Sequence, residues 1–146
     1  AQQDYSGALE KFEAVIGSPI STQEATAQKQ YALVGKGNCL VGLGQADEGL
    51  TLLNDLVSKN DPADVVLFAR TYNALGNAYL KLNRNKDALQ AFLFTDLLFY
   101  ADAESHAEAL YHLSKLWNEV NKSDRAVQAR NTLRERYSGS IWAAKE

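Results

Sequence analysis

The sequence predicts an all-α fold, and two observations support this prediction. Helix-favouring residues such as Ala, Leu, Gln, Glu, Lys and Arg dominate, and only two prolines, Pro19 and Pro62, occur in 146 residues. No alternating run of Val, Ile and Thr bounded by turn residues stands out, so no strand is predicted. We expect helices near residues 3–16, 22–42, 46–59, 63–82, 85–100, 103–120 and 123–137, and expect SGSIWAAKE to begin another.

Local signals define the ends of these helices. Ser21 to Glu24 has the form of a capping box and begins the second helix. Asp61 and Pro62 offer an N-cap and a proline at the first position of the fourth, and Asp102 can cap the sixth. The turns GLGQADEG, LNRNKDA and VNKSDRA join the helices in pairs. The first helix then has no partner before it, which indicates either a piece of a longer helical array or ends that are capped by something absent from this sequence.

Composition narrows the class of protein. The length suits one domain, and a net charge of -3 gives no reason to expect a nucleic-acid partner. No stretch approaches the roughly 20 apolar residues that a membrane-spanning helix needs, so no membrane insertion is expected. The single cysteine, Cys39, excludes an internal disulfide and is expected to be a small buried residue.

Small residues recur in pairs at a fixed spacing. Gly76 in one predicted helix is followed by Ala88 in the next, and a pair with the same separation occurs once earlier and once later in the chain. We expect each pair to mark the point where two antiparallel helices cross closely. Gly76 alone could instead end a helix as a C-cap, but the recurrence favours the crossing. The expected crossing residues are Gly37, Gly49, Gly76, Ala88, Ser114 and Ala126.

The rest of the repeat resembles the tetratricopeptide repeat (TPR) family. The family pattern is matched in full by Tyr72, Leu75, Gly76, Tyr79, Ala88 and Phe92. In the neighbouring units Lys36 stands where Leu is expected, Ser114 replaces the Gly and Arg130 replaces the Phe.

The resemblance implies an α-solenoid of about three TPR-like helical hairpins with a leading half-repeat, wound as a right-handed superhelix. The expected half-repeat covers 1–20, the repeats cover about 22–60, 62–101 and 102–138, and 139–146 is a tail, all within one domain. RERYSGSIWAAKE also resembles the junctions of bacterial cell-envelope TPR proteins, although Ser138 replaces their proline. This similarity suggests the periplasmic side of a bacterial envelope, with the cytoplasm as the alternative.

The residues suggest no enzyme, cofactor or metal site. His106 and His112 are six residues apart and do not share a helix face, and no phosphate-binding or zinc spacing is present. Glu108 and His112, four apart, could share a divalent ion, but a solvated surface pair is the preferred interpretation. Residues 122–137 are rich in Arg, and a solvated helix face is preferred there to an anion-binding patch.

The family resemblance places a partner segment on the concave face formed by the first helix of each pair. The residues on that side mix amides, tyrosines and cations, which suit a peptide backbone and an acidic segment. A solvated face with no ligand is the alternative. Val34 and Asn73 stand where the chaperone-type carboxylate clamp has its first lysine, so a chaperone-tail receptor is not expected. The expected concave-face residues are Tyr31, Val34, Asn38, Arg70, Asn73, Asn77, Lys81, Glu108, Tyr111, Lys115 and Asn118.

A rival function is a structural module that packs within a larger protein or a homo-oligomer. The segment from Ala91 to Tyr100 is apolar nearly all round, and we expect most of it to be core, because a helix in a stacked array buries two faces. Phe94 and Leu98 are the candidates for self-association: if they are exposed, they indicate either self-association or a missing neighbouring element. The preferred function is a non-catalytic scaffold that binds a protein or peptide segment.

Overall fold

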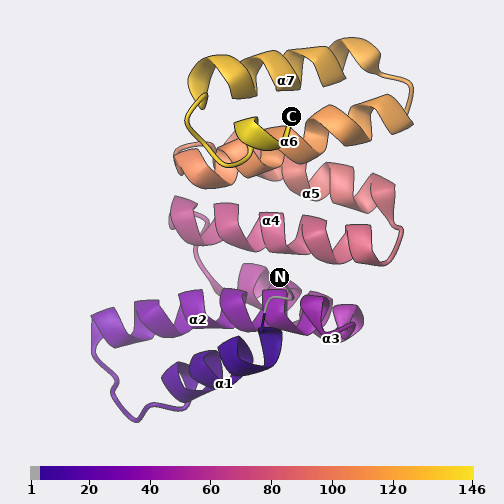
Figure 1. Ribbon diagram of the computed structural model, residues 1–146. Coiled ribbons are helices and arrows are strands. Elements are labelled where there is room, and N and C mark those ends of the chain that lie inside the picture. The colour runs from indigo at the N-terminus through magenta and orange to yellow at the C-terminus, as the bar shows by residue number, and fades with distance from the viewer. Residues whose placement is uncertain (1–3) are drawn as a thin grey trace.

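The computed structural model describes residues 4–146, in which helices are joined by turns and loops and no strand is present (Figure 1). The all-α prediction is therefore confirmed for the described part of the chain. The helices are α1 (Tyr5–Ile16), α2 (Gln23–Gly42), α3 (Ala46–Lys59), α4 (Val65–Lys81), α5 (Asn85–Leu98), α6 (Ala103–Glu119) and α7 (Ser123–Arg136), followed by the 3₁₀ helix η1 (Ala143–Lys145).

Helix ends agree with the sequence at most places. The capping-box pattern makes Ser21 the N-cap of the second helix, but the observed N-cap is Thr22, one residue later. Thr22 and Asp102 cap α2 and α6 through their side chains, which accept from the backbone N–H groups of Ala25 (3.1 Å) and Ser105 (3.3 Å). The prediction that Asp61 and Pro62 start the fourth helix is wrong. The Asp61 carboxylate instead accepts a hydrogen bond from the N–H of Ala63, within a short turn that precedes the helix.

The fourth helix begins further along the chain because Asp64 is its N-cap. The Asp64 carboxylate accepts from the N–H of Leu67 at 3.1 Å, and α4 starts at Val65. Two aspartates thus compete for the cap, and the second one satisfies the helix N-terminus.

The helices lie in two rows (Figure 1). α2, α4 and α6 lie beside one another in one row, and α3 and α5 lie behind it. Each helix also packs against the next helix in the chain, from α1 through to α7.

The turns inside three helix pairs have the same geometry. Gly44, Asn83 and Asn121 adopt positive φ values of 85°, 56° and 58° at the ends of α2, α4 and α6. The next residue in each turn donates its backbone N–H back to a carbonyl of the helix, at 2.8, 2.9 and 2.8 Å. Glycine and asparagine suit this left-handed position. The spacing of the turns along the chain equals that of the small residues in the sequence repeat.

Small residues permit close helix contacts. A Cβ added to Gly76 would lie 2.6 Å from the ring of Phe92 in α5, and one added to Gly37 would lie 2.8 Å from Leu53 in α3. A Cβ on Gly49 would lie 3.1 Å from the carbonyl oxygen of Gly37, so these two glycines approach each other directly. The other expected crossing residues, Ala88, Ser114 and Ala126, are at most 1% exposed.

The last residues do not form the α-helix that the sequence predicts. After Tyr137 the chain turns back, and η1 lies in front of α6 (Figure 1). The Ser140 hydroxyl accepts from the N–H of Ala143 at 3.1 Å and so caps this short helix. Within residues 4–146, no helix is both long and apolar enough to cross a membrane.

Candidate functional site

The inner face is the side of the α2, α4 and α6 row turned away from α3 and α5. Nine of the residues expected on a concave face are at least partly accessible. Val34 is buried among core residues, and Asn73 is 2% exposed, so neither offers its side chain to a partner as the sequence suggested. The accessible residues are Tyr31, Asn38, Arg70, Asn77, Lys81, Glu108, Tyr111, Lys115 and Asn118.

An amide–carboxylate cluster ties α4 to α6 on this face. The Glu108 carboxylate accepts from the amide of Asn77 at 3.0 Å and from that of Asn73 at 3.1 Å. Asn73 also donates to the carbonyl of Ser105 at 2.8 Å, and among the described residues its own Oδ1 has no donor. Burial raises the pKa of Glu108, and the two amide bonds oppose that rise. The cluster therefore positions the two helices and leaves Asn77 only partly free.

Tyr31 and Arg70 join α2 to α4 further along the row. The Arg70 guanidinium lies 5.2 Å from the centre of the Tyr31 ring and 4.0 Å from the carboxylate of Asp102. Arg70 is about half exposed, so this ion pair adds little to stability and leaves the guanidinium accessible.

A carboxylate site lies between α6 and α7, and sequence reasoning missed it. Glu146 Oε1 lies 2.6 Å from the Ser114 hydroxyl and 3.0 Å from Lys115 Nζ, and Oε2 lies 2.7 Å from Arg130 Nε. The Glu146 side chain is 1% exposed. Burial acts to raise the pKa of Glu146, but the three donors outweigh it and lower that pKa. Ser114 and Arg130 are two departures from the family pattern, which is the signal that could have found this site.

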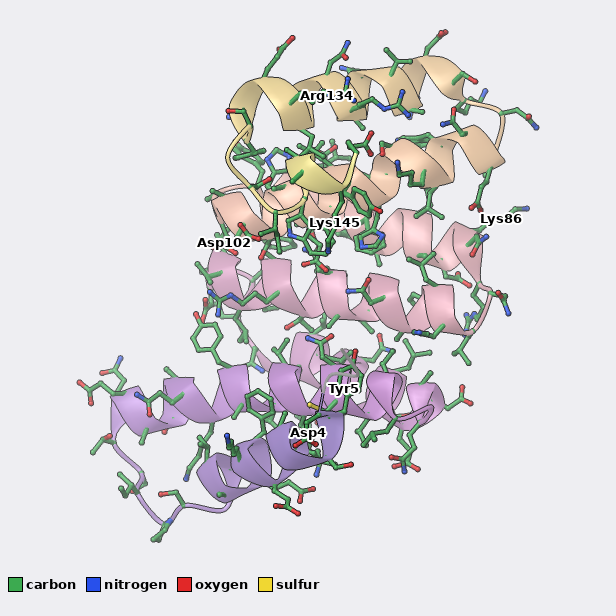
Figure 2. All side chains as sticks on the ribbon, viewed as in Figure 1. Asp4, Tyr5, Lys86, Asp102, Arg134 and Lys145 are labelled. Atoms are coloured by element: carbon green, nitrogen blue, oxygen red, sulfur yellow. The ribbon has the colours of Figure 1, made fainter. Side chains whose placement is uncertain are left out.

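An aromatic cluster lies beside that carboxylate site. The Trp142 ring is 5.5 Å from Tyr111 and 5.6 Å from His112, and His112 stacks on Phe92 at 4.5 Å. Desolvation, followed by the nearby charge of Lys145, lowers the pKa of His112 to about 4. Lys145, labelled in Figure 2, has its Nζ 3.9 Å from the Trp142 ring centre. Glu108 thus accepts from two asparagine amides and His112 packs among aromatic rings, so they are not the solvated pair that the sequence suggested.

A second polar cluster lies on the other side of α6. The His106 ring is 3% exposed and bonds through Nδ1 to the Tyr137 hydroxyl and through Nε2 to Asp96, both at 2.7 Å. It borders a cleft of about 600 Å³ between α5, α6 and α7, whose rim includes Arg125 and Arg136. Every polar ring atom of His106 is satisfied, so the cluster has the character of a structural link between α5, α6 and the end of α7.

The residues expected to self-associate differ from each other. Phe94 stacks on Tyr72 at 4.7 Å and is partly buried, whereas Leu98 is 59% exposed. Leu97 and Tyr100, which were not singled out, are 64% and 54% exposed at the same end of α5. The exposed apolar surface therefore centres on Leu97, Leu98 and Tyr100.

Cys39 is buried, as the sequence predicts, and burial raises the pKa of its thiol. Among residues 4–146 no group of three or more His, Cys, Asp or Glu residues has the arrangement to hold a metal ion. Comparisons with protein-family models, with curated proteins and with solved structures gave no match for this chain.

Proposed function

We propose that this chain is a TPR-like α-solenoid that acts as a non-catalytic scaffold and binds a peptide or partner segment on its inner face. The proposed architecture is three helical hairpins, α2–α3, α4–α5 and α6–α7, with α1 as a leading half-repeat. The recurring turns at Gly44, Asn83 and Asn121 support it, because the spacing of these turns equals the spacing of the sequence repeat.

The observation that carries the binding function is the charge of the inner face. Arg70, Lys81 and Lys115 come from α4 and α6 and are all exposed. Lys115 lies 3.0 Å from the Glu146 carboxylate and Arg70 lies 4.0 Å from that of Asp102, whereas Lys81 has no ion pair among the described residues. The Glu108 carboxylate accepts hydrogen bonds from two asparagine amides. A cationic surface with accessible tyrosines attracts an acidic segment and offers both apolar contact and hydrogen bonds to it.

A peptide array followed by matched charge reversals tests this proposal. Lys81→Glu, on the inner face, should weaken binding of acidic peptides selected by the wild-type chain by tenfold or more. Lys86→Glu is the control: Lys86 lies on the exposed surface of α5, behind the α2–α4–α6 row, and the change should leave binding within about twofold (Figure 2). Peptides that bind both variants equally, or an array with no binders at all, would refute binding on the inner face.

Self-association is a second candidate function, favoured by the exposed end of α5. Leu97, Leu98 and Tyr100 are each more than half exposed, and the two leucines border a small apolar hollow lined also by Phe94. Exposed apolar clusters of this kind mark protein interfaces. Light scattering across a concentration series tests it: a dimer that the double change Leu97→Glu and Leu98→Glu abolishes supports this function, and a monomer at all concentrations removes it.

A further inference from the structure

The 140–146 segment is held on the inner face chiefly by Trp142 and Glu146, and the partly buried Ala143 also packs against the helices. Trp142 contacts Tyr111 and His112, and the Glu146 carboxylate contacts Ser114, Lys115 and Arg130. Between and around them Ile141 is 61% exposed, and Ala144 and Lys145 are exposed as well. The segment therefore packs as a bound peptide does, through anchors, and contributes little to the core.

The two sites that receive these anchors are built by the helices themselves. Ser114 is fully buried in α6, and its hydroxyl also lies 2.7 Å from the carbonyl of Tyr111. The His112 ring stacks on the fully buried ring of Phe92, which fixes its position. Arg130 comes from α7, whose packing on α6 fixes the position of its backbone. Ser114 and His112 therefore hold their positions by contacts within α5 and α6, and α7 brings Arg130 to the same place.

The third repeat differs from the second where it meets the segment. In the second repeat Phe92 packs on Gly76. At the corresponding positions of the third repeat stand Arg130 and Ser114, and the Glu146 carboxylate lies between them. An apolar crossing has thus become a carboxylate-binding one, with three donors on a single anionic group.

We infer that Ser114, Lys115 and Arg130, with the neighbouring Tyr111 and His112, form a receptor site for a peptide segment with an aromatic residue followed four positions later by an acidic one. The chain's own Trp142 and Glu146 occupy this site in cis. Four positions correspond to about one turn of a helix, so both anchors of such a segment project to the same side. This inference rests on the proposed scaffold function and names the chemistry of the ligand.

A peptide-binding measurement on the full chain tests the inference. The probe is the labelled peptide SGSIWAAKE, blocked at both ends so that its one carboxylate corresponds to Glu146. A site that is free in one molecule in ten binds a competitor ~tenfold more weakly. The full chain carrying Trp142→Ala and Glu146→Gln should therefore bind the peptide ~tenfold or more tightly than the wild-type chain does.

Two matched controls define the recognition. The gain in affinity of the double variant should disappear when Arg130→Gln is added to it. A probe peptide carrying Glu146→Gln should bind the double variant at least ~tenfold more weakly than the original peptide does, because the ionised carboxylate makes the strong contacts. Equal binding by the wild-type chain and the double variant would overturn the inference, as would indifference to either control.

A second measurement is made on the wild-type chain, with the conservative variant Trp142→Phe as its control. Unlabelled peptide carrying Trp142→Phe is added to the wild-type chain, and displacement of Trp142 into water should shift the tryptophan emission to longer wavelength. The same titration of a chain carrying Trp142→Phe should show no shift, because Trp117 stays packed. No shift in the wild-type chain overturns the receptor site. The scaffold function stands if Lys81-dependent peptides still bind, so the two proposals fail separately.

Discussion

The contact between Gly76 and Phe92 gives the sharpest test of how the helices pack. α4 continues to Lys81, so Gly76 lies inside the helix and does not cap it. In Gly76→Ala the new Cβ would lie 2.6 to 2.8 Å from three ring atoms of Phe92, which is closer than a Cβ atom approaches other atoms in protein structures. Phe92 is fully buried and stacks on His112 at 4.5 Å, so the ring has little room to move away.

Two effects of opposite sign decide the magnitude. Overpacking costs about 1–3 kcal/mol, and replacing a helical glycine with alanine gains about 1 kcal/mol. We therefore expect Gly76→Ala to destabilise the wild-type chain by about 1 kcal/mol. When Phe92→Ala has already removed the ring, the overpacking vanishes and the same change should stabilise the chain by about 1 kcal/mol. The sign of the effect reverses between the two backgrounds.

The assay is a double-mutant cycle measured by urea unfolding, followed by circular dichroism. Phe92→Ala alone costs about 3–5 kcal/mol, which a chain of this size tolerates at a typical stability on the order of 10 kcal/mol. Gly139→Ala is the control, because nothing lies within 4 Å of its added Cβ, and it should change stability by less than about 0.5 kcal/mol. If Gly76→Ala has the same effect with and without the Phe92 ring, the steric explanation of the glycine is refuted.

Three other outcomes are expected. The pKa of His112 is lowered from 6.5 in the unfolded chain to about 4 in the folded chain. As pH falls, the unfolded chain therefore binds the proton first, and the free energy of unfolding decreases between about pH 6.5 and pH 4. At about 1.36 kcal/mol per pKa unit the loss is up to about 3 kcal/mol, and unfolding curves of a His112→Phe chain should lack this part of the pH dependence. Ala88→Leu should overpack the helix crossing and cost about 1–3 kcal/mol in a thermal melt, whereas Lys86→Leu on the exposed side of α5 should cost less than about 0.5 kcal/mol. Asp64→Ala should cost about 1 kcal/mol through loss of the α4 cap, and an equal or larger effect of Asp61→Ala would contradict the observed start of that helix.

Helix periodicity and turn residues were sufficient to predict the number and the approximate bounds of the α-helices. The bounds of α3 are those predicted, and the ends of the others differ by two residues or fewer within the described chain. The error at Asp61 arose because two aspartates close together both satisfy the local cap pattern, and tertiary packing selects between them. The expected helix after Tyr137 did not form as such, because contacts with α6 and α7 hold those residues in a different conformation.

The inner face could be predicted only in part, because spacing along a helix gives direction and not depth. Val34 and Asn73 project near the correct side but lie where neighbouring helices cover them. The pairing of Asn77 with Glu108 and of Arg130 with Glu146 joins residues 31 and 16 positions apart on different elements. Such contacts depend on the relative placement of elements, which a periodic pattern does not contain. Ser114 and Arg130 interrupted the family pattern in the sequence, and their shared partner becomes visible only in three dimensions.

The packing of the helices in two rows has a consequence for how the chain opens. α1 has substantial contacts only with α2, and α7 only with α6, whereas α4 packs against α2, α3, α5 and α6. Local unfolding should therefore begin at the two ends of the chain and reach the central helix α4 last. Backbone amide protons should exchange with deuterated water fastest in α1 and slowest in α4.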